Sequence, residues 1–192
     1  MAEAHSRQRV HLLGLFGAIL LVLVIVISLI VVYSGLTGVA ASKPEGTVTA
    51  WVLGTTMDHS VRRQAAGISP DLSSADLAEG AEHYTAMCTM CHGGPGGELP
   101  NYIGVGLNPT PPDLREAAGD WKPGEVYWII EHGIKMTGMP AFGKTHSPEQ
   151  LTNITAFVVK LPTMTAEEYQ RLIGPGPATS MPSGAESPHH QE

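Results

Sequence analysis

An uncharged apolar segment near the N-terminus constrains the fold of this chain most strongly. Residues 12–32 run for 21 residues without a charged side chain. At a rise of about 1.5 Å per residue, a helix of this length crosses the hydrocarbon core of a bilayer. With Tyr33 at the membrane interface, the sequence predicts a transmembrane helix at 12–33, preceded by a short N-terminal segment, 1–11. The chain is therefore expected to be divided between membrane and water.

The basic residues around this helix predict its orientation. Arg7 and Arg9 precede the apolar segment, and the next basic residue after it is Lys43. Because positive side chains stay preferentially on the cytoplasmic side, we expect a cytoplasmic N-terminus and a globular part on the opposite side of the membrane. A cleaved signal peptide is the alternative, since residues 39–41 are small. The apolar core exceeds the roughly 7 to 15 residues of ordinary signal peptides, which favours an anchor.

Composition divides the remaining chain into three parts. Residues 34–72 are rich in Gly, Ser, Thr and Ala and predict a linker, in which the run 47–53 is the most strand-like. Residues 73–173 contain the globular domain. Residues 174–192 are rich in Pro, Gly and Ser and predict a disordered tail.

Helical periodicity and capping residues predict three to four helices in the globular part, and hence an all-α fold. These helices run from Ser73 or Ser74 to Cys88, from about Gly124 to Glu131 with Gly133 as the C-cap, from Ser147 to Leu161, and from Thr165 to about Ile173. The third has the clearest start, because Ser147, Pro148 and Gln150 supply an N-cap, a first-turn proline and a capping box.

A proline- and glycine-rich stretch, 93–123, follows the first of these helices and has no helical period. So long an irregular stretch in a compact domain requires something else to supply the core. Directly before it, Cys88, Cys91 and His92 form a C-x-x-C-H motif, the attachment signal of a c-type haem. Each thiol can form a thioether to a porphyrin vinyl group, with the adjacent imidazole under the iron. The sequence thus predicts one covalently bound haem c, wrapped by the irregular chain.

Other uses of the two cysteines fit less well. A redox-active dithiol is expected in a βαβ context, which the sequence lacks. A zinc site needs two further ligands, and His132 and His146 have no usual zinc spacing. Nucleic-acid binding is also disfavoured, because Lys+Arg 11 against Asp+Glu 18 gives a net charge of -7.

With these landmarks the chain resembles a class I monohaem cytochrome c in a membrane-anchored bacterial form. The resemblance covers residues 60–172 and rests on three strings, CTMCHGGPG from Cys88, GLNPTPPDL from Gly106 and EVYWIIEHGIKMTGMPAFGKTHS from Glu125. It implies the class I cytochrome c fold, with three to four helices around one haem. It also implies that a carbonyl of the proline-rich loop accepts the second ring N–H of the haem-ligating histidine, which points to Pro109, Pro111 or Pro112.

The resemblance further implies that a methionine in the loop before the last long helix binds the sixth position of the iron. That role falls to Met139, between Gly138 and Pro140, with Met136 as its rival in the same loop. A bis-histidine site is the weaker alternative. Gly80 is expected to pack where the first and last long helices cross.

Iron held by His92 and Met139 has no free position for substrate, so the expected function is electron transfer rather than catalysis. The expected setting is the bacterial inner membrane, with the haem domain in the periplasm. The expected partners are a quinol-oxidising complex or a dehydrogenase on one side and a terminal oxidase or reductase on the other. Two alternatives stay open: a fixed subunit of a larger respiratory complex, and a haem enzyme with an open or labile sixth site.

Overall fold

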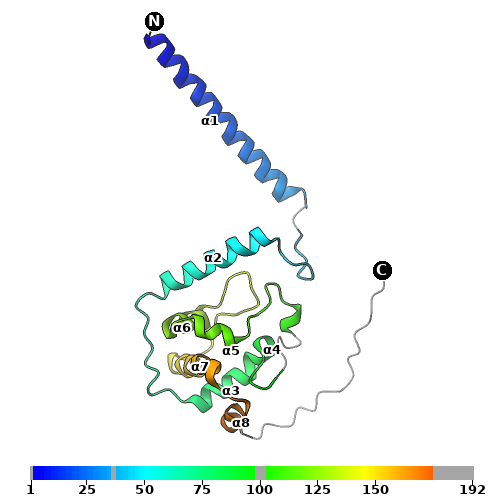
Figure 1. The fold of residues 1–192 in the computed structure, drawn as a ribbon, viewed down its shortest axis with the longest axis vertical. Coiled ribbons are helices and arrows are strands. Elements are labelled where there is room, and N and C mark those ends of the chain that lie inside the picture. The colour runs from blue at the N-terminus through cyan, green and yellow to red at the C-terminus, as the bar shows by residue number, and fades with distance from the viewer. Residues whose placement is uncertain (1, 36–37, 98–102, 175–192) are drawn as a thin grey trace, which may run out of the picture. The chain divides into compact units, whose positions relative to one another are not determined.

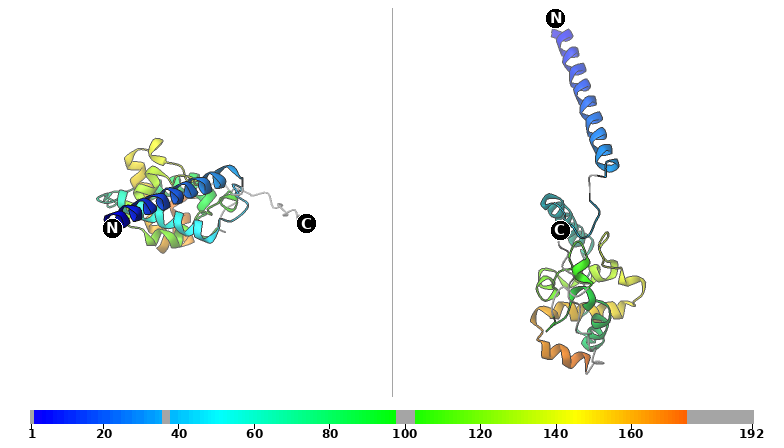
Figure 2. Two further views of the ribbon diagram at one scale, coloured as in Figure 1. Left: turned by 90° about the horizontal axis from the view of Figure 1, so that it is seen from above. Right: turned by 90° about the vertical axis from the view of Figure 1, so that its right-hand side faces the viewer.

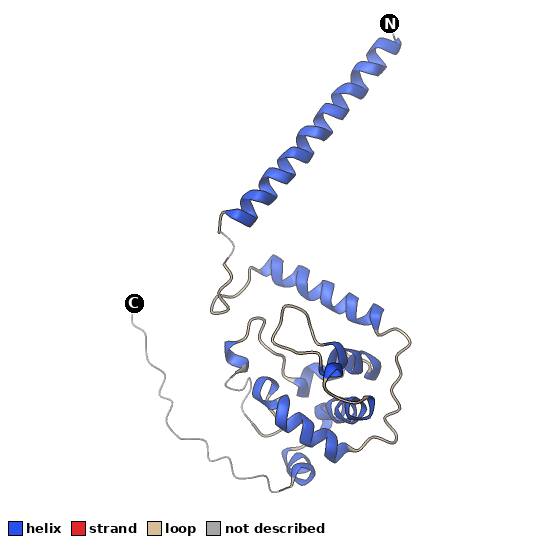
Figure 3. Ribbon diagram, turned by 180° about the vertical axis from the view of Figure 1, so that it is seen from behind, coloured by secondary structure: helices blue, strands red, loops and turns tan. Residues whose placement is uncertain are grey.

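The computed structural model describes residues 2–35, 38–97 and 103–174, and these residues form helices and loops without a strand (Figures 1 and 3). The eight α-helices in these described ranges are α1 (Ala2–Tyr33), α2 (Thr47–Gln64), α3 (Leu77–Met87), α4 (Thr89–His92), α5 (Leu114–Ala117), α6 (Pro123–His132), α7 (Pro148–Lys160) and α8 (Ala166–Ile173). This confirms the all-α prediction. The predicted tail lies outside the described residues except for Gly174.

The chain divides into two compact units, Met1–Lys43 and Pro44–Glu192. In the first unit, α1 contains the segment His11–Tyr33, which is long and apolar enough to cross a membrane. Its apolar side chains are exposed throughout, as a lipid-facing helix requires. The segment agrees with the predicted transmembrane helix at 12–33.

The second unit is a helical domain built on the crossing of α3 and α7, with α6 and α8 packed against that pair (Figure 2). Its fully buried side chains include Tyr84, Phe157, Leu151, Ile154 and Leu161. The two long helices touch at Gly80, where an added Cβ would overlap the carbonyl oxygen of Asn153 and lie 3.0 Å from the Cβ of Phe157. The predicted role of Gly80 at this crossing is confirmed.

Two of the predicted helix starts are confirmed in detail. Ser147 caps α7, with its hydroxyl 3.2 Å from the backbone nitrogen of Gln150, and the Gln150 side chain accepts the Ser147 N–H. Thr165 and Glu168 form the same reciprocal box at α8. Each box satisfies N–H groups that the first helical turn leaves without a partner.

The start of α3 differs from the prediction. Instead of Ser73 or Ser74, Asp76 is the N-cap, and its carboxylate accepts the N–H groups of Ala78 and Glu79. Ser73 instead donates to the side chain of Asp71, which holds the preceding residues in a turn.

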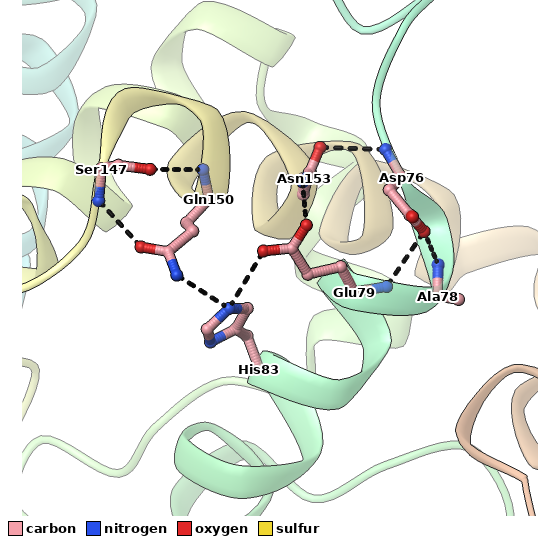
Figure 4. Close-up of polar contacts among 7 residues, drawn as sticks. All are labelled: Asp76, Ala78, Glu79, His83, Ser147, Gln150 and Asn153. Carbon is pink, nitrogen blue, oxygen red and sulfur yellow. Dashed lines mark hydrogen bonds and ion pairs between the residues drawn. The ribbon is translucent and has the colours of Figure 1, made fainter.

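A polar network then joins the start of α3 to α7 (Figure 4). The buried Asn153 accepts the N–H of Asp76 at 2.9 Å and donates to the carboxylate of Glu79 at 2.8 Å. The half-buried His83 joins this network: its Nε2 lies 3.5 Å from the carboxylate of Glu79 and 3.5 Å from the side-chain nitrogen of Gln150. The amide of Asn153 thereby fixes the N-terminal end of the helix that leads into the cysteine motif.

The prediction of a linker with a strand-like run at 47–53 is wrong for residues 47–64, which form α2. β-Branched residues favour strands only where a neighbouring strand is available to pair with them. Here Val61 and Ala65, 1% and 5% exposed, instead pack the helix against the domain, and α2 contacts α6. Figure 1 shows α2 alongside the other helices of this unit.

Candidate haem-binding site

The second unit contains an apolar cavity of about 310 Å³. Its walls come from one residue of α2, the ends of α3 and α4, the proline-rich segment before α5, α5 itself, one side of α6, the loop after α6 and the middle of α7. Four predicted site residues, Cys88, Cys91, His92 and Met139, all line this one cavity. The fold therefore brings together residues that are about 50 positions apart in the sequence.

The cysteine motif sits on the junction of two helices. Cys88 ends α3, with its N–H bonded to the carbonyl of Tyr84 at 2.8 Å, and α4 then carries Cys91 and His92. Burial, reinforced by the neighbouring Cys91, raises the pKa of the Cys88 thiol to about 12. A redox-active dithiol uses a cysteine with a lowered pKa, so this environment disfavours that alternative.

His92 is oriented by the proline-rich segment. Its Nδ1 lies 2.8 Å from the carbonyl oxygen of Pro112, which selects one of the three predicted prolines. Burial lowers the pKa of the imidazole, while the Pro112 hydrogen bond opposes that shift. The ring is therefore held in its neutral form, with Nε2 free of this hydrogen bond, as a metal-binding histidine requires.

The Pro112 carbonyl is in turn fixed by the residue after it. Asp113 caps α5 by accepting the N–H of Arg115, and the Arg115 guanidinium makes a two-pronged ion pair with the same carboxylate at 2.7 to 3.1 Å. This ion pair holds the pKa of Asp113 below its usual value. On the other side of the motif, the buried Tyr84 donates to the carbonyl of Gly93 at 2.7 Å, which fixes the chain as it leaves α4.

Hydrogen bonds within its own loop hold Met139. The Thr137 hydroxyl donates to the carbonyl of Ile134 at 2.7 Å and accepts the N–H of Met139 at 3.1 Å. Ile134 returns a backbone N–H to the Met139 carbonyl at 3.3 Å. The half-buried Met139 side chain lines the cavity and packs against the core.

The rival methionine of this loop lies elsewhere. Met136 is 92% exposed, does not line the cavity and has a φ of 63°. Met87 lines the cavity as well, at the edge of the core. The histidines of the bis-histidine alternative, His132 and His146, do not line it: His132 stacks on Trp128 and His146 packs edge-on against Phe142.

The zinc alternative also finds no support. Among the residues that the structure describes, no three or more His, Cys, Asp or Glu side chains are grouped so that they could hold a metal ion. The walls of the cavity instead suit a large apolar ring. Two cysteines for attachment, one oriented neutral histidine and a thioether side chain all face the same apolar space, so the residues present fit a covalently bound haem.

Sequence reasoning missed one wall of this cavity. Met57 of α2 lines it together with Trp121, and the guanidinium of Arg62 lies 5.5 Å from the centre of the Trp121 ring. A further close contact lies beyond the end of α2, where a Cβ on Gly124 would overlap the carbonyl oxygen of Ile68. The spacing of Met57, Val61 and Ala65 at i, i+4 and i+8 was the available signal for this helix.

Glycines make room for the Met139 loop. Gly138 approaches the side chain of Leu107, since a Cβ there would lie 2.8 and 3.0 Å from its methyl groups. Gly133 has a φ of +64°, and a Cβ there would lie 2.6 Å from the carbonyl of Pro140 and 2.7 Å from that of Met139. The backbone that carries Met139 therefore rests directly on Gly133.

Replacing Gly133 by alanine is expected to displace the Met139 loop, because the new Cβ meets backbone atoms that cannot rotate away. We expect a weaker or lost methionine-to-ferric charge-transfer band in the optical spectrum and faster binding of carbon monoxide to the reduced protein. Gly174→Ala is the matched control, since Gly174 has nearly the same φ, +66°, with nothing within 4 Å of an added Cβ. Equal spectra for the two variants would contradict a positioning role for Gly133.

Comparison with known proteins identifies the family of this chain. A model of the family described as cytochrome c oxidase, cbb3-type, subunit III matches residues 75–158. The chain is 30% identical over 93 residues to cytochrome c6 of Thermosynechococcus vestitus, a match covering 48% of this chain and 76% of that protein. No solved structure gives a significant match.

Two other relatives are longer proteins. The cbb3-type cytochrome c oxidase subunit FixP of Sinorhizobium medicae is 31% identical over 104 residues, which is 48% of this chain and 32% of FixP. The 1-butanol dehydrogenase (cytochrome c) of Thauera butanivorans is 27% identical over 138 residues, which is 67% of this chain and 18% of that protein. The matches thus span a third or less of these two relatives. By the cytochrome c6 match, the family model and the cavity, the chain belongs to the class I monohaem cytochromes c, electron-transfer proteins with one covalently bound haem c, here in a membrane-anchored form.

Proposed function

We propose that this cytochrome relays single electrons between membrane-bound redox partners, and that His92 and Met139 are the two residues that would bind its haem iron. The observation that carries the proposal is that both side chains line one apolar cavity, while Nδ1 of His92 is already engaged by Pro112. A haem with histidine and methionine ligands supplies reversible one-electron transfer at a raised reduction potential.

In this proposal the protein positions the two iron ligands and excludes substrates from the iron, and it does not transfer protons. Pro112 orients His92, burial favours the neutral form of its ring, and Thr137 holds the backbone of Met139. A thioether ligand and an apolar surround both favour the less charged, reduced state of the site. With His92 and Met139 both holding the iron, the haem would have no coordination site left for oxygen, peroxide or another substrate, and it would pass electrons without bond making or breaking.

The proposed partners are a quinol-oxidising complex or a dehydrogenase as donor and a terminal oxidase or reductase as acceptor. The proposed setting is the bacterial inner membrane, with the N-terminus cytoplasmic and the haem domain periplasmic. The names of two relatives, an oxidase subunit and a cytochrome-linked dehydrogenase, support this kind of partner. Because the chain has a net charge of -7, we expect a partner with a basic docking surface and an exchange rate that falls as salt is added.

The name of FixP favours a second arrangement, in which the chain is a fixed subunit of a larger respiratory complex. The chemistry of the site is the same in both arrangements, and only the persistence of the contact differs. Purification in mild detergent separates them. A stable multi-subunit complex means a fixed subunit, whereas a free chain that exchanges electrons with added partners means a mobile relay.

An optical experiment on the native, haem-loaded chain tests the ligation. We expect the oxidised protein to show the weak methionine-to-ferric charge-transfer band, and the reduced protein to keep its spectrum when carbon monoxide is added. Both results reflect a filled sixth position. Ready binding of carbon monoxide would instead mean an open or labile site and would favour the haem-enzyme alternative.

A further inference from the structure

The N-terminal half of α2 exposes an apolar surface that no other described element covers. Val48, Trp51 and Val52 share one side of the helix at i, i+3 and i+4, and Leu53 lies about 100° further round the helix. They are 74%, 68%, 45% and 59% exposed, in that order. We call these four residues the α2 patch. Between Glu45 and Asp58 the chain has no charged side chain at all.

The C-terminal half of the same helix packs against the haem domain, and we call this packed side of α2 the seat. Val61 is buried, Met57 lines the haem cavity, and Arg62 lies over the ring of Trp121. The seat uses the side of α2 at positions 57, 61 and 65, in the C-terminal half of the helix. Val48 and Val52 lie on the opposite side of the helix, and the exposed Trp51 and Leu53 border the seated side nearer the N-terminus. The packing that buries one end of α2 therefore leaves the α2 patch facing outward.

The covalent connection to the membrane anchor limits how far the α2 patch can be from lipid. Tyr33 ends α1 and Thr47 begins α2, so the connection is residues 34–46. Thirteen residues span at most about 45 Å even when fully extended. The start of α2 therefore stays within this reach of the end of α1, which raises the effective concentration of the α2 patch at the lipid surface.

The chemistry of the patch suits a lipid interface. Tryptophan is enriched at the boundary between headgroups and acyl chains, and an uncharged face next to it can enter that boundary. Over residues 43–64, Lys43, Arg62 and Arg63 against Glu45 and Asp58 give a net charge of +1, although the whole chain has -7. This part of the chain is thus free of the net negative charge that would repel anionic headgroups.

We propose that the α2 patch binds the lipid surface next to the membrane anchor and so fixes how the haem domain is presented there. Because α2 also supplies Met57 to the wall of the haem cavity, one rigid helix carries both the lipid contact and part of the haem site. The lipid contact would therefore select which side of the domain faces a partner. This inference goes beyond the proposed electron relay and does not depend on which residue is the sixth iron ligand.

Spin labelling of the full, haem-loaded chain in liposomes of phosphatidylethanolamine and phosphatidylglycerol tests the proposal. Cys88 and Cys91 carry thioethers, so one added cysteine is labelled alone. We compare Val52→Cys in the α2 patch with the exposed Gln64→Cys at the far end of the same helix. The label at 52 is expected to relax several-fold more with oxygen than with a water-soluble nickel chelate, and the label at 64 the reverse.

Three other outcomes would overturn the proposal. Equal access of the nickel chelate to both labels would mean that the α2 patch stays in water. Protection of position 52 from both reagents that disappears as protein is diluted in lipid would mean contact with a second copy. Protection that dilution leaves unchanged would mean burial against protein.

A second variant tests whether the α2 patch itself places the label at position 52 in lipid. Trp51→Ser changes only an exposed side chain, so the haem spectrum should stay native, while the oxygen preference of the label at 52 should fall towards that at 64. An unchanged oxygen preference would mean that the patch does not hold the label in lipid.

Discussion

Met139→Ala is expected to abolish the methionine-to-ferric charge-transfer band, to open the reduced protein to carbon monoxide and to lower the reduction potential. Met139 is the half-buried methionine of its loop and lines the cavity with His92. As an iron ligand its thioether would favour ferrous iron, and the ligands of the iron set haem potentials over a range of about 0.8 V. We therefore expect the largest change in potential that a single side chain of this loop can produce.

Met136→Ala is the matched control, because the same substitution is made three residues away in the same loop. The Met136 side chain is 92% exposed and outside the cavity, so its removal should leave the spectrum and the potential unchanged. Redox titration and carbon monoxide binding on both variants provide the measurement. If Met136→Ala removed the band and Met139→Ala kept it, the assignment of the sixth ligand would be reversed.

A native-like spectrum in both variants would point to a different ligand altogether. Met57 and Met87 also line the cavity, so each is a thioether within the same apolar space. Met57 belongs to α2, outside the residues 75–158 that the family model covers. Combining Met139→Ala with Met57→Ala would then show whether α2 supplies the iron ligand.

Local signals in the sequence predicted the parts of the fold that depend on neighbouring residues. The capping boxes at Ser147 and Thr165 are reciprocal hydrogen bonds over three residues, so the sequence alone contains both partners. The start of α3 was harder, because Ser73, Ser74 and Asp76 are all good N-caps. Asp76 is selected by a partner 77 positions away, since Asn153 accepts its N–H.

In the candidate site, too, the sequence predicted the local features and missed those that depend on long-range contacts. The C-x-x-C-H motif is local and predicted Cys88, Cys91 and His92, whereas the choice among three prolines depended on how the loop returns to the histidine ring. Helix α2 was missed because threonine and valine at 47–49 favour a strand on intrinsic preference alone. Its helical form depends on burying Val61 and Ala65 against the domain, a long-range contact that the sequence pattern shows only weakly.

Gly80→Ala is expected to destabilise the folded protein by about 3 kcal/mol, the upper part of the range for overpacked cores. An added Cβ at Gly80 would overlap the carbonyl oxygen of Asn153 and lie 2.8 Å from its carbonyl carbon. These are backbone atoms of a buried helix, so α3 and α7 would have to move apart along their whole contact. In a helix without such a contact, the same substitution stabilises by about 1 kcal/mol.

Gly54→Ala in α2 provides that contrast. Gly54 lies inside a helix, and nothing lies within 4 Å of an added Cβ, so this variant should be slightly more stable than the native protein. Denaturant unfolding of the two haem-loaded variants should therefore give shifts of opposite sign. Equal shifts would mean that helix propensity rather than the α3–α7 contact sets the effect. Because α3 leads directly into Cys88, the Gly80 variant should also lose the haem environment at a lower denaturant concentration, which links the helix crossing to the redox site.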